Sequence, residues 1–188
     1  MGAVCVDDSA VNGINVYGVV LYQTAHPGKM LNFMGYEVAQ LREWDERREQ
    51  DWFLRDYPAH DSFFRFCCEL NKVYRETPAL WELDYDEKGF SWLEADDTEN
   101  VTYAFLRNAE DGSCVVCALN LSGEFAKCEL SVPGATSAEV LLHSDWERFG
   151  GDTPDDEGRL VVNAGKVALE LPACSAVLAS LTRTDKKA

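Results

Sequence analysis

The sequence predicts a mainly β protein, with an antiparallel β-sandwich over residues 86–188 preceded by a mixed α/β part over residues 1–85. After residue 86, many short apolar runs alternate with turn residues, a pattern typical of antiparallel sandwiches. Before residue 86, apolar residues recur at helical intervals beside one short apolar run. Hydrophobic residues make up 46% of the chain and charged residues 27%, which is the composition of a folded globular protein.

The part before residue 86 contains two expected helices, an expected strand and a long loop. A helix over Val16–Ala25 ends at His26-Pro27-Gly28, because proline and glycine stop a helix and begin a turn. Met30–Met34 is a short apolar run that fits a buried strand. Tyr36–Tyr57 has no clean period, and we expect a structured loop with one helical turn. A second helix over Ala59–Glu76 begins after a proline and carries apolar residues along one face.

The part after residue 86 is expected to form strands separated by turns. They cover residues 89–95, 101–107, 114–121, 125–132, 138–143, 160–162, 166–171 and 176–181. Asp111-Gly112 and Pro133-Gly134 are turn signals between neighbouring strands. Because the connections are short, we expect antiparallel pairing. The polar stretch 144–158 is expected to be a loop.

The charge of the chain limits its partners. The formal net charge is −16, and such a surface repels nucleic acid and anionic lipid, since phosphate binding needs clustered lysine and arginine. No apolar stretch approaches the roughly 20 residues that a membrane span needs. The first residues also lack the basic and apolar regions of a signal peptide. We therefore expect a cytoplasmic protein that binds neither nucleic acid nor membrane, whereas a neutral sugar polymer remains an acceptable partner.

The seven cysteines have an odd count and irregular spacing, which is a poor disulfide framework. Cys114 and Cys117 form a CxxC, but on a strand their side chains face opposite sides, and no second CxxC or nearby histidine completes a zinc site. We expect buried free thiols in a reducing compartment, and no metal site.

Several unusual strings of the chain occur in the order of one known family. His26–Glu37 reads HPGKMLNFMGYE and resembles the HPGKKLLFMGxE segment of bacterial 1,4-α-glucan (glycogen) branching enzymes, which belong to the α-amylase group of glycosidases and transferases. Arg42-Glu43-Trp44 and Asp51-Trp52 resemble the REWN and LDW elements of that family. The match continues through residues 70–74, 78–84, 89–92 and 95–100. Together the strings span about residues 25–181, while Val4–Val19 matches nothing in the family.

The resemblance implies a fold for each part of the chain. Met30–Met34 would be the last strand of a (β/α)₈ barrel, Tyr36–Tyr57 the loop after it and Ala59–Glu76 the last barrel helix. Residues 1–85 would then be the remnant of the last barrel unit, and residues 86–188 the C-terminal β-sandwich domain. A complete barrel needs about 250 residues, far more than this part provides.

The resemblance also implies an activity in glycogen biosynthesis, in which an α-1,4-linked glucan chain is cleaved and transferred to a 6-hydroxyl without a cofactor. The catalytic Asp, Glu and second Asp of the family stand at the ends of the fourth, fifth and seventh barrel strands, and all lie upstream of the matched residues. We therefore assign no catalytic residue to this chain and expect it to be inactive alone. The alternative is a stand-alone glucan-binding or protein-interaction module.

Five residues near the expected end of the barrel strand are candidates for binding glucan in the intact enzyme: Glu37, Arg42, Trp44, Asp51 and Trp52. Aromatic faces stack on sugar rings, and charged groups exchange hydrogen bonds with hydroxyls. The alternative is structural: Glu37 pairs with Arg42 as a buried acid, and the tryptophans pack the loop against the barrel.

Other residue types give weaker signals. The acid pairs at 7–8, 96–97 and 155–156 are expected to be solvated turns. The histidines at 26, 60 and 143 share no triad or metal spacing. Trp92 is expected in the core, and Trp146 in a polar loop is expected to be exposed, where it could contact a ligand. Since the barrel remnant lacks neighbouring strands, we expect either self-association through it or its repacking onto the sandwich.

Overall fold

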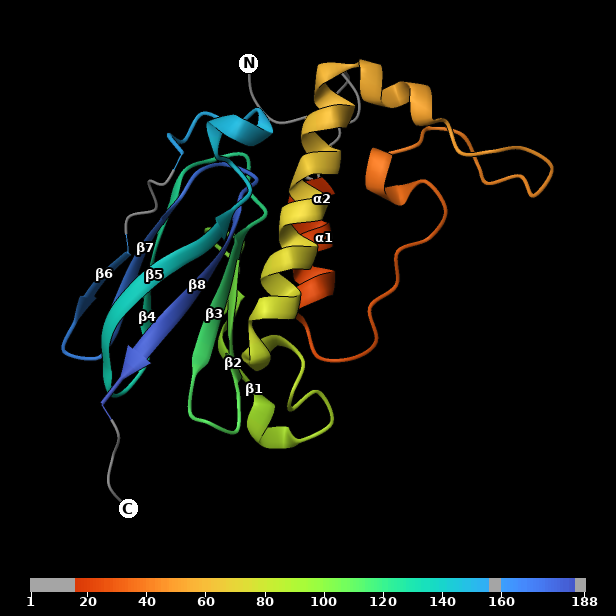
Figure 1. Ribbon diagram of the computed structural model, residues 1–188. Coiled ribbons are helices and arrows are strands. Elements are labelled where there is room, and N and C mark those ends of the chain that lie inside the picture. Colours follow the sequence, from red (N-terminus) through yellow and green to blue (C-terminus); the bar gives the residue numbers. More distant parts are fainter. Residues whose placement is uncertain (1–15, 156–159, 185–188) are drawn as a thin grey trace.

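The computed structural model describes residues 16–155 and 160–184, and Figure 1 shows its arrangement. The two long helices are α1 (Val16–Ala25) and α2 (Pro58–Glu76). Short 3₁₀ helices are η1 (Tyr36–Val38), η2 (Trp52–Asp56), η3 (Pro78–Leu80), η4 (Glu87–Gly89) and η5 (Glu147–Phe149). The strands are β1 (Phe90–Asp97), β2 (Thr102–Asn108), β3 (Cys114–Asn120), β4 (Ala126–Ser131), β5 (Ala135–His143), β6 (Leu160–Asn163), β7 (Lys166–Leu171) and β8 (Ala176–Arg183).

The strands form two antiparallel sheets, which confirms the predicted sandwich. One sheet has the order β1-β2-β3-β8-β5 and the other β4-β7-β6. The helices α1 and α2 cover the face of the larger sheet that is turned away from the smaller one (Figure 1). The described residues therefore form three layers, namely a small sheet, a large sheet and a pair of helices.

Strand β3 lies in the middle of these layers, and all seven of its residues are buried. Cys114, Val116 and Ala118 pack in the core between the sheets. The intervening Cys117 and Leu119 pack in the core under the helices. The CxxC thiols thus face opposite sides of the sheet as predicted, and burial raises the pKa of Cys117, so it serves as a small apolar side chain.

Both predicted helices are present, and their ends follow the predicted signals. Helix α2 begins at Pro58, where the missing N–H costs nothing because a first-turn N–H has no partner in the helix. It ends at Thr77, which precedes Pro78 and takes an extended conformation. Phe63, Phe66 and Leu70 of α2 lie buried against the large sheet.

The prediction of a strand over Met30–Met34 is wrong. Residues 30–33 have no regular secondary structure, Met34 begins a turn, and the segment belongs to no sheet. Among the described residues its backbone makes two hydrogen bonds: the Leu31 carbonyl accepts from Gln23 Nε2 at 2.6 Å, and the Phe33 carbonyl accepts from the Tyr36 N–H at 3.0 Å. A strand needs a hydrogen-bonded neighbour, and no described segment lies beside this one in that way.

A buried arginine joins the helical part to the sandwich. The Arg107 side chain on β2 is fully buried. It donates to the carbonyl of Ala25 at the end of α1, to the carbonyl of Gly89 at 3.1 Å, and to the Asp84 carboxylate. Gly89 is required at this point because a Cβ there would lie 2.2 Å from the Leu83 carbonyl oxygen.

Candidate functional site

The loop from Tyr36 to Tyr57 lies on the side of the helices that faces away from both sheets (Figure 1). It contains two short helical turns, η1 and η2, rather than the one expected. Val38 and Leu54 anchor it, since both are buried, and His60 Nδ1 on α2 lies 2.7 Å from the Val38 carbonyl. The loop is therefore held on α2 while its middle extends outward.

Arg42 and Asp51 close the loop with an ion pair. Arg42 Nη2 donates to Asp51 Oδ1 at 2.8 Å, and Arg42 Nε lies 3.1 Å from both carboxylate oxygens. The guanidinium also donates to the Glu49 carbonyl at 2.7 Å. The hydrogen bonds that Arg42 donates to the Asp51 carboxylate raise the pKa of Arg42. The alternative pairing of Arg42 with Glu37 is wrong, because Glu37 instead accepts from Asn32 Nδ2 at 3.2 Å.

The two loop tryptophans keep much of their surface in solvent. Trp44 is 44% exposed and Trp52 is 46% exposed. The Trp44 ring makes an edge-to-face contact with Phe33, with centroids 5.9 Å apart. Around Trp44, residues 42–48 surround an open hollow of about 570 Å³. The loop thus presents an aromatic face beside charged groups.

Gln40 is a supporting residue that sequence reasoning missed. Its Oε1 accepts from the Asp51 N–H at 2.9 Å, and its Nε2 donates to the Arg42 carbonyl at 3.1 Å. Gly35 permits this arrangement with a φ of 85°, and a Cβ there would lie 2.8 Å from Gln40 Oε1. A glycine after an apolar run, followed by a glutamine, is a weak signal, so only the geometry identifies the role.

The adjacent acids form no catalytic pair among the described residues. The Asp97 carboxylate accepts from the Thr102 hydroxyl at 2.6 Å and the Asn100 N–H at 3.0 Å. These bonds lower the pKa of Asp97 to about 2, so it cannot donate a proton near neutral pH. Asp155 accepts from the Arg148 N–H at 2.9 Å. The pair at 7–8 and Asp156 lie outside the described residues.

The histidines are separated, as predicted, and each has a local structural setting. His26 packs on Phe90, with ring centroids 5.1 Å apart. His60 supports the loop. His143 at the end of β5 is buried, and its Nδ1 accepts from the Asp145 N–H at 3.0 Å. Burial lowers the pKa of His143 to about 4.

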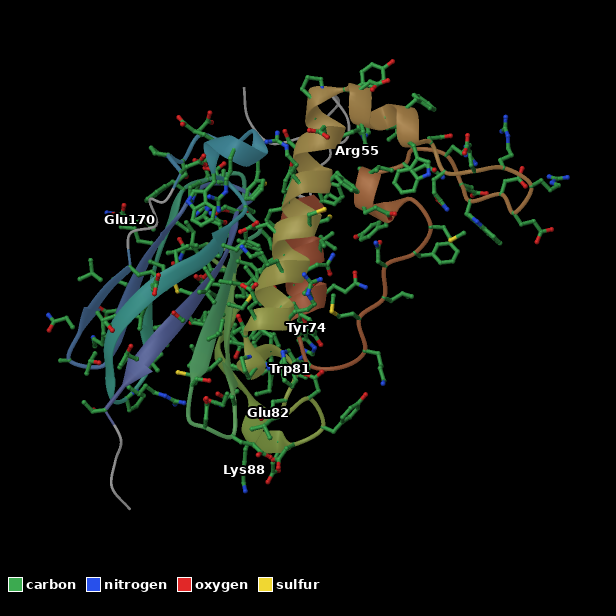
Figure 2. All side chains as sticks on the ribbon, viewed as in Figure 1. Arg55, Tyr74, Trp81, Glu82, Lys88 and Glu170 are labelled. Atoms are coloured by element: carbon green, nitrogen blue, oxygen red, sulfur yellow. The ribbon has the colours of Figure 1, made fainter. Side chains whose placement is uncertain are left out.

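The remaining tryptophans do not form a common platform. Trp146 was expected to be exposed, and this is wrong: it is only 3% exposed because it packs beside Phe149, and the Arg148 guanidinium covers its ring at 4.1 Å. Trp92 is 45% exposed, so it is only partly in the core. Trp81 follows α2, near the opposite end of that helix from the loop (Figure 2).

Comparison with known proteins identifies the sandwich. Residues 92–182 match the family described as the α-amylase C-terminal all-β domain. The α-amylase from Geobacillus thermoleovorans, solved with acarbose, has a TM-score of 0.66 and 18% identity over 91% of this chain and 34% of its own. The debranching enzyme from Nostoc punctiforme has a TM-score of 0.61 and 17% identity over 90% of this chain and 31% of its own. At these identities the solved structures show a shared fold.

Similarity to sequence relatives identifies the family more narrowly than the shared fold does. A 1,4-α-glucan branching enzyme from Leifsonia xyli is 42% identical over 138 residues, which are 73% of this chain and 19% of the relative. The branching enzyme from Rhodococcus jostii is 36% identical over an alignment of 188 positions that covers 94% of this chain and 26% of the relative. The chain thus spans about a fifth to a quarter of the length of these relatives. It belongs, as a part that includes the C-terminal all-β domain, to the bacterial 1,4-α-glucan branching enzymes of the α-amylase group.

Proposed function

We propose that this chain serves as the C-terminal part of a glycogen branching enzyme, which cleaves an α-1,4 linkage and transfers the released chain to a 6-hydroxyl. The observation that carries the proposal is the 36% identity that extends over 94% of the chain. This match includes the exposed loop as well as the sandwich. The sandwich would then shield and stabilise a barrel rather than react with substrate.

Within that enzyme, we propose that the loop binds α-glucan, as glycogen or amylose. Trp44 and Trp52 offer half-exposed rings that stack on sugar faces. Glu37, Arg42 and Asp51 lie on the same loop and offer donors and acceptors to hydroxyls. The Arg42–Asp51 pair supports this role by holding the loop's shape before sugar binds.

The chain alone is proposed to have no branching activity. Retaining transfer needs two carboxyl groups about 5 Å apart, one of which has a raised pKa so that it can donate a proton. The described carboxyl groups whose pKa moves clearly are Asp45, Asp97 and Asp111, and each is lowered by hydrogen bonds. A lowered pKa removes the proton that a catalytic acid must deliver.

Branching of amylose tests this proposal. The purified chain, shown to be folded by circular dichroism, is expected to leave the iodine colour unchanged and to form no α-1,6 linkages detectable by NMR. Formation of α-1,6 linkages by the pure chain would contradict it and would direct attention to Glu37 and Asp51. The reaction itself is proposed to need no cofactor.

The alternative function is a stand-alone glucan-binding module, which the exposure of Trp44 and Trp52 favours. Under the main proposal the isolated chain keeps only part of the affinity for maltoheptaose that the intact enzyme has, whereas a stand-alone module binds maltoheptaose as tightly without the rest of the enzyme and without turnover. As compartment we propose the cytoplasm, since the six described cysteines are free thiols. The described residues contain no helix with the length and hydropathy of a membrane span.

A further inference from the structure

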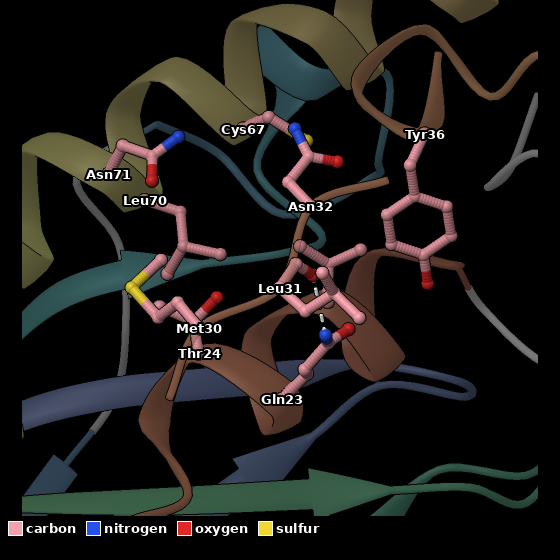
Figure 3. Close-up of a pocket in the computed structure, with 10 residues that line it drawn as sticks. Gln23, Thr24, Met30, Leu31, Asn32, Tyr36, Cys67, Leu70 and Asn71 are labelled. Carbon is pink, nitrogen blue, oxygen red and sulfur yellow. Dashed lines mark hydrogen bonds between the residues drawn. The ribbon is translucent and has the colours of Figure 1, made fainter. Parts of the chain in front are cut away.

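A second candidate site lies between the two helices and the segment that precedes the loop. It is a cavity of about 270 Å³. Figure 3 shows Gln23 entering it from α1, Leu70 and Asn71 from α2, and Leu31 and Asn32 from the segment between the helices. These elements are far apart in sequence, so the cavity is a product of the tertiary structure.

Beside the hydroxyl groups of Thr24 and Tyr36, the cavity is lined by three carboxamide side chains that have unused hydrogen-bonding capacity. Gln23 Nε2 donates to the Leu31 carbonyl, which leaves Gln23 Oε1 available. Asn32 Nδ2 donates to Glu37, which leaves Asn32 Oδ1 available. The Asn71 side chain is exposed and makes no hydrogen bond to any described residue. A carboxamide both donates and accepts, so the cavity presents both kinds of group.

The lining specifies a neutral, partly apolar ligand. None of the side chains that line the cavity is charged, and Val20, Leu31 and Leu70 provide apolar surface. A net charge of −16 disfavours phosphorylated ligands. A sugar ring combines an apolar face with hydroxyl groups that each donate and accept. The cavity volume lies just below the roughly 300 Å³ at which pockets for drug-sized ligands begin, so it fits one ring rather than a chain.

We propose that this cavity binds a single glucosyl unit of an α-glucan, with Asn71 and Gln23 contacting its hydroxyl groups. The inference rests on the proposed function, because that function supplies the identity of the sugar. Tyr36 lines the cavity and begins η1, and Asn32 of the cavity contacts Glu37 of the loop. The cavity therefore adjoins the start of the loop, through Tyr36 and through the contact between Asn32 and Glu37.

The experiment is a titration of the folded chain with maltoheptaose, followed by ¹⁵N–¹H NMR of the side-chain amides. The Asn71 and Gln23 amide signals are expected to shift saturably. Asn71→Leu is expected to weaken binding about tenfold, because it removes a donor and an acceptor while keeping similar volume. Lys72→Ala is the matched control, since Lys72 is the exposed neighbour on α2 and does not line the cavity.

A parallel titration of Trp44→Ala separates the two proposals. If Trp44→Ala weakens binding but Asn71→Leu does not, or if the amide signals do not shift, the cavity proposal is overturned and the proposal that the loop binds glucan is retained. Binding that weakens with Asn71→Leu alone would support the cavity and argue against the loop. Absence of any binding by the folded chain would overturn the cavity proposal, while the branching assay would still decide the function of the chain.

Discussion

Trp44 is the loop residue whose exposed ring has the clearest chemical use. It keeps 44% of its surface in solvent and touches Phe33 edge-on, which leaves ring surface available to a sugar. Trp44→Ala is expected to weaken maltoheptaose binding about two- to tenfold, in line with the roughly 0.5–1.5 kcal/mol that aromatic contacts contribute. Isothermal titration calorimetry measures this. Trp81→Ala, at a similarly exposed tryptophan outside the loop, is the control and should leave the affinity unchanged.

His143 should make the stability of the chain depend on pH. Burial lowers its pKa to about 4 from an ordinary value of 6.5, so between these values the unfolded state binds more protons than the folded state. The free energy of unfolding is therefore highest above pH 6.5 and falls by up to about 3 kcal/mol as the pH drops toward 4.

Urea unfolding at pH 7.5 and pH 5 checks this, with His143→Asn as the control. The asparagine Oδ1 can accept the Asp145 N–H but does not titrate. The wild-type chain should lose more stability between the two pH values than the variant does. Equal losses would mean that His143 does not titrate differently in the folded and unfolded states.

Arg107 shows how one buried charge connects separate segments. Arg107→Met would remove donors to Ala25 and Gly89 and leave the Asp84 carboxylate, 10% exposed, without its partner. Breaking a buried pair in this way is expected to cost about 3–5 kcal/mol, measured by urea unfolding. Adding Asp84→Asn should recover part of that loss. Arg47→Ala, which breaks an exposed pair, should cost less than about 1 kcal/mol.

Residue-scale features were the hardest to predict from sequence. Trp146 stands in a polar stretch, yet Phe149 and the Arg148 side chain bury it, and those contacts form only when the loop folds. Arg107 sits in a strand pattern that gives no hint of burial. Partners that meet across 80 or more residues, such as Arg107 and the Ala25 carbonyl, leave no local signal.

At the scale of elements, prediction succeeded where the signal is local. The strands alternate with turn residues, and α2 has both an initiating proline and a terminating one, so each element is encoded within its own segment. Met30–Met34 has the same kind of apolar run but fails as a strand, because pairing depends on a neighbour rather than on the run itself. An apolar run therefore indicates that a segment can form a strand, but not that a neighbouring strand is present to pair with it.

That unpaired segment should promote self-association. Leu31 is 66% exposed and Phe33 57% exposed, and most of the backbone groups around them are unpaired, which is the surface that an edge strand offers to another chain. Sedimentation velocity should show dimers as concentration rises. A Leu31→Lys, Phe33→Lys variant should raise the dissociation constant at least tenfold. Val161→Lys, at an exposed position of β6, is the control. A wild-type chain that stays monomeric at every concentration would contradict self-association through this segment.

At the scale of the whole molecule, the division into residues 1–85 and 86–188 remains a prediction. The helices and the sheet share one core, in which Leu21 and Phe66 pack with Phe105 and Leu178. Tyr17 on α1 also donates to the Phe149 carbonyl at 3.0 Å, across 132 residues. Because residues 1–85 and 86–188 share this core, the stability of each part depends on the other.

We therefore expect urea to unfold the described parts in a single transition, with far-UV circular dichroism and tryptophan fluorescence coinciding. The helices and the large sheet lose the same core when either unfolds. Two separated transitions would instead indicate that the predicted domains are independent. The measurement is made at a concentration below the onset of self-association, so that dissociation of dimers does not contribute to the unfolding curve.

The sheet order also has a consequence for how the chain is made. Strand β8 follows every other described strand in the sequence, yet it lies between β3 and β5 in the large sheet. During synthesis, β3 and β5 emerge from the ribosome well before the strand that joins them. Until residue 183 is available, β3 and β5 each have an unpaired edge, and α1 lacks its contacts with β8. The nascent chain thus passes through an interval in which unpaired strand edges favour aggregation, and shortening that interval should increase the yield of folded protein.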